Sequence, residues 1–237
     1  MTDYDIFSKT YDTAMGDRSD VAELLRELVR KNNPGAKSVL ELACGTGAIL
    51  RRFARDYAVT GVDLSKGMLT IARKELPNVK FLRRDITNFR LNKKFDAIIC
   101  VYDSINHILD FEGWEKVFAN ANAHLAEGGV FIFDINTLWK LRNILTYPPE
   151  IHKLGEDYMI LKVRTPATNM FNWNVKFFEH RTGANYRLRV ENIRETSFHP
   201  EKIKKALKPY FKSVHVIDAD RKSPSKLSER LYFVCKN

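Results

Sequence analysis

The chain has 237 residues, 44% of them hydrophobic, which is enough to bury the core of one large domain or of a domain with an insertion. No apolar run approaches the roughly 18–20 residues of a membrane helix and no secretory signal opens the sequence, so we expect a soluble, cytoplasmic protein. The net charge of +10 falls on residues 138–237, which hold 20 of the 39 Lys and Arg but only 10 of the 29 Asp and Glu. A basic half is typical of proteins that bind anionic substrates or nucleic acid, although scattered lysines also simply favour solubility.

The first half of the chain alternates short apolar runs with amphipathic stretches. The expected strands are 38–43, 58–63, 78–85, 95–102 and 129–136, and several of them are apolar almost throughout, as strands buried on both faces should be. The expected helices, with apolar residues at three- and four-residue spacing, are 20–32 (capped by Asp20), 48–56, 66–76 and 111–125. Strand–helix alternation with short connections predicts an α/β fold with a doubly wound, mostly parallel sheet.

This pattern changes after Asn136 and returns near the end of the sequence. After a short helix at 138–145, the sequence predicts three strands, the last two forming a hairpin around an Arg-Thr-Gly turn: 157–165, 170–180 and 184–198. A helix and two strands then resume the α/β pattern at 200–211, 213–219 and 231–237. We therefore predict one domain made of 1–137 and 199–237, with 138–198 inserted as a helix and a small antiparallel sheet.

The cysteines and histidines do not form a recognisable metal or redox motif. Cys44, Cys100 and Cys235 lie far apart, and two of them lie within apolar segments. This spacing predicts three buried thiols in a reducing compartment and no metal site.

The loop after the first expected strand is the strongest ligand signal. The run LELACGTGAIL (40–50) passes from a strand through Gly45 and Gly47 into a helix, which allows a ligand to approach the backbone closely. Asp63 ends the next strand, 18 residues after Gly45, where an acidic side chain suits a pair of ribose hydroxyls. Because Leu50 replaces the third glycine of the dinucleotide fingerprint and no phosphate-binding GK[ST] follows, an adenosine without phosphates fits best.

Five motifs occur in order: VLELACGTG, VTGVDLSKGML, FLRRDITNF, FDAIICVYDSINHI and LAEGGVFIFDIN. Together they resemble class I S-adenosylmethionine-dependent methyltransferases, which implies a Rossmann-like sheet of seven strands and S-adenosyl-L-methionine as the cofactor. The N-terminal Tyr-Asp pair, the DSINH run and the inserted sheet are similar to a group related to glycine and amino-sugar N-methyltransferases. The resemblance covers about residues 35–137 and extends to the last two strands.

The resemblance also implies roles for individual residues around the cofactor. Glu41 would order the ammonium group, Asp63 would bind both ribose hydroxyls, and Asp85 with the Ile86 amide would bind the adenine. The remaining cofactor-binding candidates, which would line the methionyl, sulfonium and adenine parts or close over the site, are Tyr11, Ala43, Gly45, Gly47, Leu64, Met68 and Tyr102.

Each of these roles has a structural alternative that the sequence leaves open. Glu41 could anchor a helix or loop, and Asp63 could cap the helix that begins near Ser65. Asp85 could start a turn, and Met68 could belong to the core. Tyr11 could lie on the surface.

Several residues at the strand ends are expected to contact the methyl acceptor, namely Tyr102, Asn106, His107 and Asn136. His107 is the best candidate for a general base, and the alternative is a hydrogen-bonded structural histidine. Asp103 and Ser104 are expected to cap the next helical turn. The inserted sheet is expected to form a lid, from which the acceptor could be reached by Trp173, Phe177, Tyr186 or Arg187.

The leading hypothesis is therefore methylation of a nitrogen, or an oxygen, of a small molecule. The alternative is an RNA methyltransferase that docks RNA on the basic second half. A nucleotide-linked dehydrogenase and a cofactor-binding protein without catalysis are two further alternatives. The [DN]PP[YF] motif of amino-group DNA methyltransferases is absent after the fourth strand, and the sequence does not decide between a monomer and a dimer.

Overall fold

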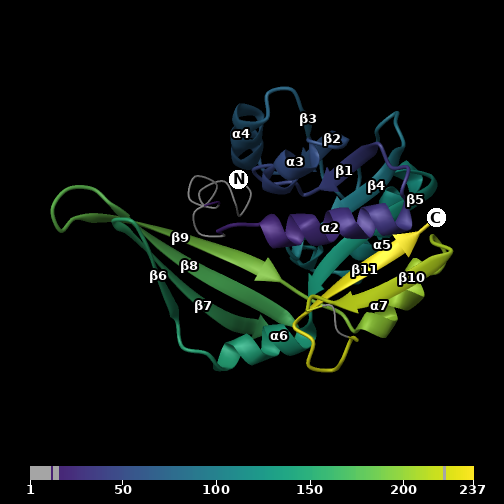
Figure 1. The fold of residues 1–237 in the computed structure, drawn as a ribbon. Helices are drawn as coiled ribbons and strands as arrows, with labels where there is room; N and C mark the ends of the chain where they lie inside the picture. The colour runs from purple at the N-terminus through teal and green to yellow at the C-terminus, as the bar shows by residue number, and fades with distance from the viewer. Residues whose placement is uncertain (1–11, 13–15, 221–222) are drawn as a thin grey trace.

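The computed structural model describes residue 12 and residues 16–220 and 223–237. Two sheets organise this part of the chain (Figure 1). One is a seven-stranded sheet covered by helices, and the other is a four-stranded sheet that projects away from it. Among the described residues, no helix combines the length and the apolar character needed to cross a membrane.

The larger sheet has the strand order β10-β11-β5-β4-β1-β2-β3. Its strands are β1 (Ser38–Leu42), β2 (Ala58–Asp63), β3 (Lys80–Arg83), β4 (Phe95–Cys100), β5 (Leu125–Asn136), β10 (Ser213–Asp218) and β11 (Arg230–Lys236). Strands β1 to β5 are parallel, whereas β11 runs antiparallel to both β5 and β10. This arrangement confirms the predicted doubly wound sheet. The chain order reverses between β1 and β4, so the ends of these strands form the expected ligand crevice.

Helices cover both faces of the larger sheet, and α6 (Leu138–Asn143) packs on the smaller sheet. The other helices are α2 (Ser19–Asn32), α3 (Ala48–Phe53), α4 (Lys66–Glu75), α5 (Phe111–His124) and α7 (Pro200–Leu207), with single turns η1 (Ser104–His107) and η2 (Ile144–Thr146). Neighbouring residues of one strand enter opposite cores: Ile98 packs with α5 and α7, and Ile99 packs with α2 and α3. The prediction that Asp20 caps α2 is wrong, because the helix already begins at Ser19 and Asp20 lies in its first turn.

The smaller sheet is an antiparallel meander of β6 (Glu150–Leu154), β7 (Asp157–Ala167), β8 (Met170–His180) and β9 (Tyr186–Glu195). The sequence predicted three of these strands and missed β6. The side chains of β6 are exposed except for partly buried Leu154, so this strand lacks the apolar alternation that marks the other three. The exact bounds of the inserted domain stay a prediction.

The register of this sheet separates its side chains into two faces. The packed face contains a cluster of Met159, Val175, Phe177 and Ile193, and its Val163 and Phe171 pack on α6. The open face contains no buried residue and carries Tyr186, Leu188 and Val190 among other exposed apolar side chains. The Lys and Arg residues of the open face have no acidic neighbour on that face. They are Lys153, Lys162, Arg164, Lys176 and Arg194.

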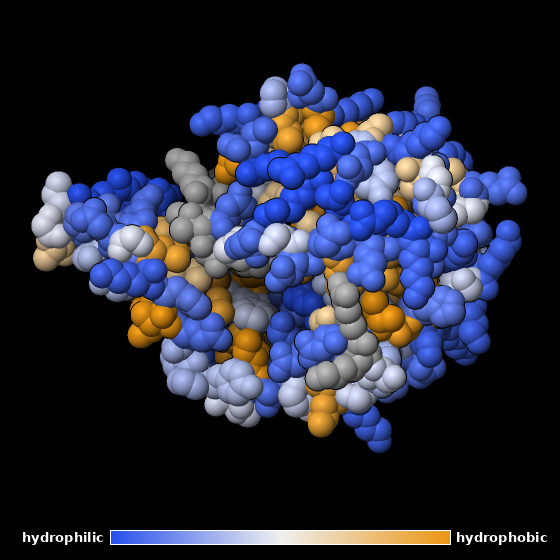
Figure 2. Space-filling view, viewed as in Figure 1, coloured by the Kyte–Doolittle hydropathy of each residue, from blue (hydrophilic) through white to orange (hydrophobic). Residues whose placement is uncertain are grey.

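This register also sorts the four predicted acceptor contacts of the inserted sheet. Trp173, Phe177 and Arg187 alternate on the packed face, together with Glu195. Tyr186 lies on the open face, and its contact with an acceptor stays a prediction. Figure 2 shows the surface hollowed between the four-stranded sheet at the left and the helix-covered sheet at the right.

Candidate active site

The loop that follows β1 has an unusual backbone. Ala43, Gly45 and Gly47 all have positive φ angles, of 52°, 53° and 78°. A Cβ added at Gly45 would meet no atom of the described residues within 4 Å, whereas one at Gly47 would lie 3.3 Å from the Phe81 ring. Gly45 therefore faces open space, and Gly47 is needed where the loop enters α3. Ala43 is strained, which is common where a backbone is shaped for a ligand.

Asp63 joins the ends of β1 and β2. One carboxylate oxygen accepts a hydrogen bond from the Gly45 amide and the other from the Ser65 amide, both at 2.8 Å. The side chain of Ser65, rather than that of Asp63, caps α4 by accepting from the Met68 amide at 3.2 Å. Each carboxylate oxygen can accept a further hydrogen bond, so Asp63 can still bind hydroxyl groups.

Glu41 is a buried carboxyl group, with 3% of its surface exposed. Its Oε2 atom has no hydrogen-bond partner among the described residues. Burial raises the pKa of Glu41 well above its usual value, although nearby Arg18 acts in the opposite direction. A buried acceptor without a donor is costly, so this atom marks a place where a cationic or hydrogen-bonding ligand group fits.

Residues before and in α2 close this end of the sheet. The Arg18 guanidinium lies 5.3 Å from the centre of the Tyr102 ring and 3.1 Å from the Asp12 carboxylate. Asp12 also accepts a hydrogen bond from Thr46 at 2.7 Å. Tyr102 has a positive φ of 58°, and burial raises its pKa to about 12. The sequence analysis assigned no role to Asp12, Arg18 or Thr46, although Thr46 lies within the VLELACGTG motif and Asp12 follows Tyr11.

The predicted adenine end contains residues in quite different settings. Asp85 accepts from the Thr87 amide at 2.8 Å and its hydroxyl at 2.7 Å, so it does form a turn. Met68 and Ile86 are buried, whereas Leu64 is 48% exposed. The cofactor contacts of these four residues stay predictions, and Tyr11 lies outside the described residues.

An ion-pair network fixes the turn after β4. Arg230 of β11 donates to Asp134 of β5 and, at 2.6 Å, to Asp103, while the Asp103 amide donates to Asp134 at 3.0 Å. Burial raises the pKa of Asp134. Burial alone would raise that of Asp103, but Arg230, His107 and Lys140 bring it below its usual value. The prediction that Asp103 caps the next turn is wrong, because Arg230 takes its carboxylate and no side-chain cap forms.

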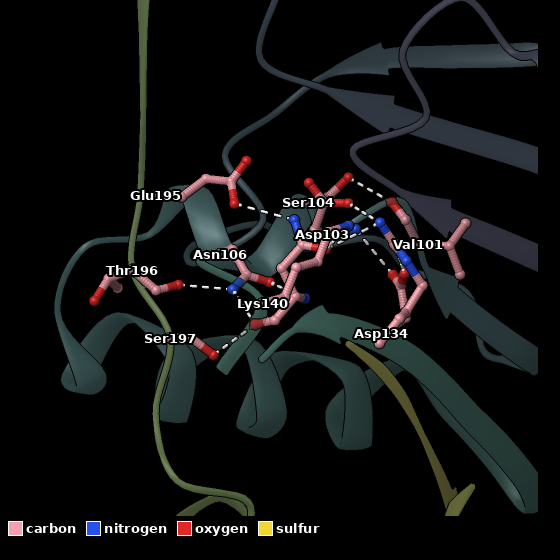
Figure 3. Close-up of polar contacts among 11 residues, drawn as sticks. Val101, Asp103, Ser104, Asn106, Asp134, Lys140, Glu195, Thr196 and Ser197 are labelled. Carbon is pink, nitrogen blue, oxygen red and sulfur yellow. Dashed lines mark hydrogen bonds and ion pairs between the residues drawn. The ribbon is translucent and has the colours of Figure 1, made fainter. Parts of the chain in front are cut away.

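Asn106 connects the two sheets (Figure 3). Its amide nitrogen donates to the carbonyls of Asn136 and Thr196 at 3.0 and 2.7 Å, and its oxygen accepts from the Asn136 amide at 3.1 Å. The side chain is fully buried, and both amide hydrogens are used. The predicted contact of Asn106 with an acceptor stays untested, and the geometry gives it the role of holding β5 against the end of β9.

His107 and Glu195 complete this polar group. One ligating atom from each of Asp103, His107 and Glu195 lies within 4.8 Å of the others, a set that could also ligate a metal ion. Asn136 links Glu195 to Lys140: its amide donates to Glu195 at 3.1 Å, and its oxygen accepts from Lys140 at 2.9 Å. The sequence missed Asp134, Lys140, Glu195 and Arg230, because only the fold brings these separate segments together.

Residues 39–129 match a family described as a methyltransferase domain. Over 99% of each chain, the protein is similar to a S-adenosylmethionine-dependent methyltransferase from Clostridium acetobutylicum, with 30% identity and a TM-score of 0.87. The chain belongs to the S-adenosylmethionine-dependent methyltransferases.

Two further similarities concern methyltransferases of sugars. The methyltransferase is 37% identical over 136 residues to dTDP-3-amino-3,4,6-trideoxy-alpha-D-glucopyranose N,N-dimethyltransferase of Streptomyces venezuelae. That alignment covers 55% of this chain and 54% of the relative, so it spans about half of each. CalS10, an amino pentose methyltransferase from Micromonospora echinaspora, shares the fold with a TM-score of 0.81 at 23% identity, over 98% and 96% of the two chains.

The residues at the ends of β1 and β2 fit the cofactor of this family. The space beside Gly45, the unpartnered Oε2 of Glu41 and the two-oxygen acceptor of Asp63 offer the contacts that S-adenosylmethionine requires. We call these strand ends, with Glu41, Gly45 and Asp63, the donor edge, because they are the expected place of the methyl donor. The Asp103–His107–Glu195 group lies beyond the neighbouring strand β4.

Proposed function

We propose that this methyltransferase transfers a methyl group to an amino nitrogen of a small molecule, and that an amino sugar carried on a nucleotide is the leading acceptor class. The observation that carries the proposal is the group formed by Asp103 and His107, which follow β4 (Phe95–Cys100), and by Glu195, which ends β9. These side chains can bind an ammonium group and accept its proton beside the donor edge. The 37% identity to a sugar N,N-dimethyltransferase supports nitrogen rather than oxygen.

The donor edge supplies binding and orientation in this proposal. S-adenosylmethionine brings the reactive carbon and its leaving group, so the protein's task is alignment. Glu41 would accept from the cofactor's ammonium group and Asp63 from its ribose hydroxyls, with the Ala43–Gly47 backbone along the methionyl part. Met68, Asp85 and Ile86, with Leu64, would surround the adenine.

The acceptor end supplies positioning and proton transfer. Tyr102 stays protonated at neutral pH because its pKa is raised to about 12, so it can donate a hydrogen bond but cannot act as a base. His107 and the carboxyl groups beside it are the candidate bases. The packed face of the inserted sheet would cover the acceptor, as Glu195 at its end already points to Asn136. Excluding water in this way strengthens the electrostatic contacts within the site.

A labelled-methyl screen tests the proposal. The protein is incubated with methyl-labelled S-adenosylmethionine and dTDP-3-amino-3,4,6-trideoxy-α-D-glucopyranose, free amino sugars, matched hydroxyl sugars, or tRNA and rRNA. We expect label on the amines, in step with S-adenosylhomocysteine formation, and none on the matched hydroxyl sugars. Label on RNA alone would replace the proposal with the RNA alternative, and cofactor binding without transfer to any acceptor would refute it.

A further inference from the structure

Three proton-accepting side chains from three segments meet at the acceptor end of the site. Asp103 follows β4, His107 ends η1 and Glu195 ends β9, and one ligating atom of each lies within 4.8 Å of the others. Among the described residues, this is the one such group of three His, Cys, Asp or Glu side chains.

The contacts that these three side chains already make leave them with different capacities to accept a further hydrogen bond. The Asp103 carboxylate is held by Arg230 at 2.6 Å. His107 Nδ1 lies 3.1 Å from the Arg194 carbonyl, which can only accept, so the neutral ring carries its hydrogen on Nδ1 and its lone pair on Nε2. Glu195 Oε2 accepts from Asn136 at 3.1 Å, and no described residue donates to Oε1. Asp103 Oδ2 likewise has no donor among the described residues, but Asp103 already pairs with Arg230 through Oδ1. Glu195 is therefore the carboxyl group of the three that has an open oxygen and no cation in contact with it.

The charges around this group do not balance. Three buried or partly buried carboxyl groups face two cationic side chains, and these five residues are Asp103, Asp134, Glu195, Lys140 and Arg230. Glu229 also faces Lys140, but it is exposed, so solvent screens its charge and it is left out of this count. Arg230 contacts Asp103 and Asp134 directly, while Lys140 reaches Glu195 only through Asn136. Glu195 is only 4% exposed, and burial together with the charge of Asp103 raises its pKa well above the usual value. The group thus lacks one cation, and a proton takes its place when no ligand is bound.

We propose that the missing cation is the ammonium group of the acceptor, seated between Asp103, His107 and Glu195, and that Glu195 removes its proton. The inference rests on the proposed function, and it assigns a base other than His107. It also assigns the packed face of the inserted sheet, through Glu195, a direct part in acceptor recognition.

The proposed step conserves atoms and charge. The ammonium ion gives one proton to the Glu195 carboxylate, which leaves a neutral amine and a carboxylic acid. The amine lone pair forms the nitrogen–carbon bond as the carbon–sulfur bond of the cofactor breaks, and both electrons of that bond remain on sulfur. The product is a methylated ammonium ion. Glu195 keeps its proton while the site is empty and gives it to solvent when the next ammonium ion binds.

Charge favours an ammonium ion over a divalent metal at this place. With all three carboxyl groups ionised and His107 neutral, a single positive charge neutralises the five surrounding groups. A divalent ion would leave an excess positive charge beside Arg230 and Lys140, both of which contact the Asn136 oxygen, at 3.1 and 2.9 Å. The metal is therefore the competing occupant for the experiment to distinguish.

One measurement tests the amine site and can be made before the acceptor has been identified. The carboxyl ¹³C resonance of Glu195, assigned with Glu195→Gln, is titrated with pH in the protein saturated with S-adenosylhomocysteine. We expect glucosamine to lower the titration midpoint of Glu195 and glucose, its neutral match, to leave it unchanged. Equal behaviour of the two sugars, or a response to manganese ion but not to glucosamine, would overturn the inference.

A second measurement uses turnover with the amine found in the labelled-methyl screen. We expect Glu195→Gln to lower kcat/KM about 100-fold and to move the acid limb of its pH profile upward, because the bound amine must then arrive neutral. Glu201→Gln is the control, since Glu201 lies in the first turn of α7, outside the inserted sheet, and pairs with Lys204 at 3.0 Å. It should keep both the rate and the pH profile.

The two measurements separate the inference from the proposed function. If wild-type protein methylates no amine but glucosamine still shifts the Glu195 titration, the function is wrong and the amine site stands. If amines are methylated and Glu195→Gln retains the rate and pH profile, the function stands and the inference is wrong.

Discussion

Replacing Arg230 by methionine should destabilise the protein strongly, because it removes the cation that Asp103 and Asp134 share. Asp134 is completely buried, and its carboxylate contacts the Arg230 guanidinium. The Arg230 side chain is 21% exposed and contacts Asp103 at 2.6 Å. Methionine keeps much of the volume but leaves Asp134 in the core with only the Asp103 amide as a donor.

The expected cost follows from the burial of Asp134. Removing one partner of a buried ion pair costs about 3–5 kcal/mol, because the other charge remains without compensation. Water that enters beside the partly exposed residue 230 offsets some of this cost, so we expect the lower end of that range. For a chain of this size, that loss lowers Tm by about 10 °C.

The loss should also depend on pH. Burial raises the pKa of Asp134 in the folded protein, and removing Arg230 raises it further. A folded-state pKa above the unfolded value means that the folded state binds more protons, so stability falls as pH rises above about 4. The difference between Arg230→Met and wild type should therefore be small near pH 4 and largest near pH 7.

Urea unfolding at several pH values measures this difference. Arg30→Met is the matched control, because Arg30 is half exposed and pairs with exposed Glu23 at 2.7 Å, so its loss should cost less than about 1 kcal/mol. A cost for Arg230→Met that is equally small, or one that does not change between pH 4 and 7, would refute the reasoning.

Four further variants test the two ends of the site, three at the donor edge and one, Tyr102→Phe, at the acceptor end. Asp63→Ala should weaken S-adenosylhomocysteine binding at least about tenfold in calorimetry, and unchanged affinity would mean that Asp63 is misassigned. Gly45→Ala should reduce cofactor affinity with a loss of stability near 1 kcal/mol, because its Cβ enters open space at positive φ. Gly47→Ala should instead lower Tm, since its Cβ approaches Phe81 to 3.3 Å. If Gly45→Ala lowers Tm more than Gly47→Ala does, and Gly47→Ala weakens cofactor binding more, then Gly45 does not face the ligand and Gly47 is not limited by Phe81. Tyr102→Phe should keep the pH profile of turnover below about pH 10, since a phenol with a pKa of about 12 is not the base, and a lost limb would contradict this.

The sequence was sufficient to predict the larger sheet because its signals are local. Buried parallel strands such as β4 are apolar almost throughout, and helices such as α4 repeat their apolar residues, so each element is visible within ten residues. The Gly45–Gly47 loop and Asp63 are neighbours in the structure, as the sequence predicted, because the pairing of β1 with β2 brings the ends of these strands together. Only β6 was missed, since its side chains are mostly exposed.

The acceptor end could not be predicted in the same way because its residues meet only through tertiary structure. Arg230 reaches Asp103 across 127 positions, and Asn106 contacts Thr196 across 90. Asp103 shows the consequence: read locally, it suits a helix cap, but an ion pair with a distant arginine takes its carboxylate instead. The positive φ angles of Ala43 and Tyr102 are equally invisible to a local reading, because neither residue favours that conformation.

The open face of the inserted sheet limits how two molecules can approach each other. Its exposed Ile151, Tyr186, Leu188 and Val190 offer the apolar surface on which extended sheets commonly stack. The lysines and arginines between them all carry the same sign, so two such faces repel each other when they meet. Since salt screens this repulsion, the protein's resistance to self-association should depend on ionic strength, with its open face as the place where aggregation begins.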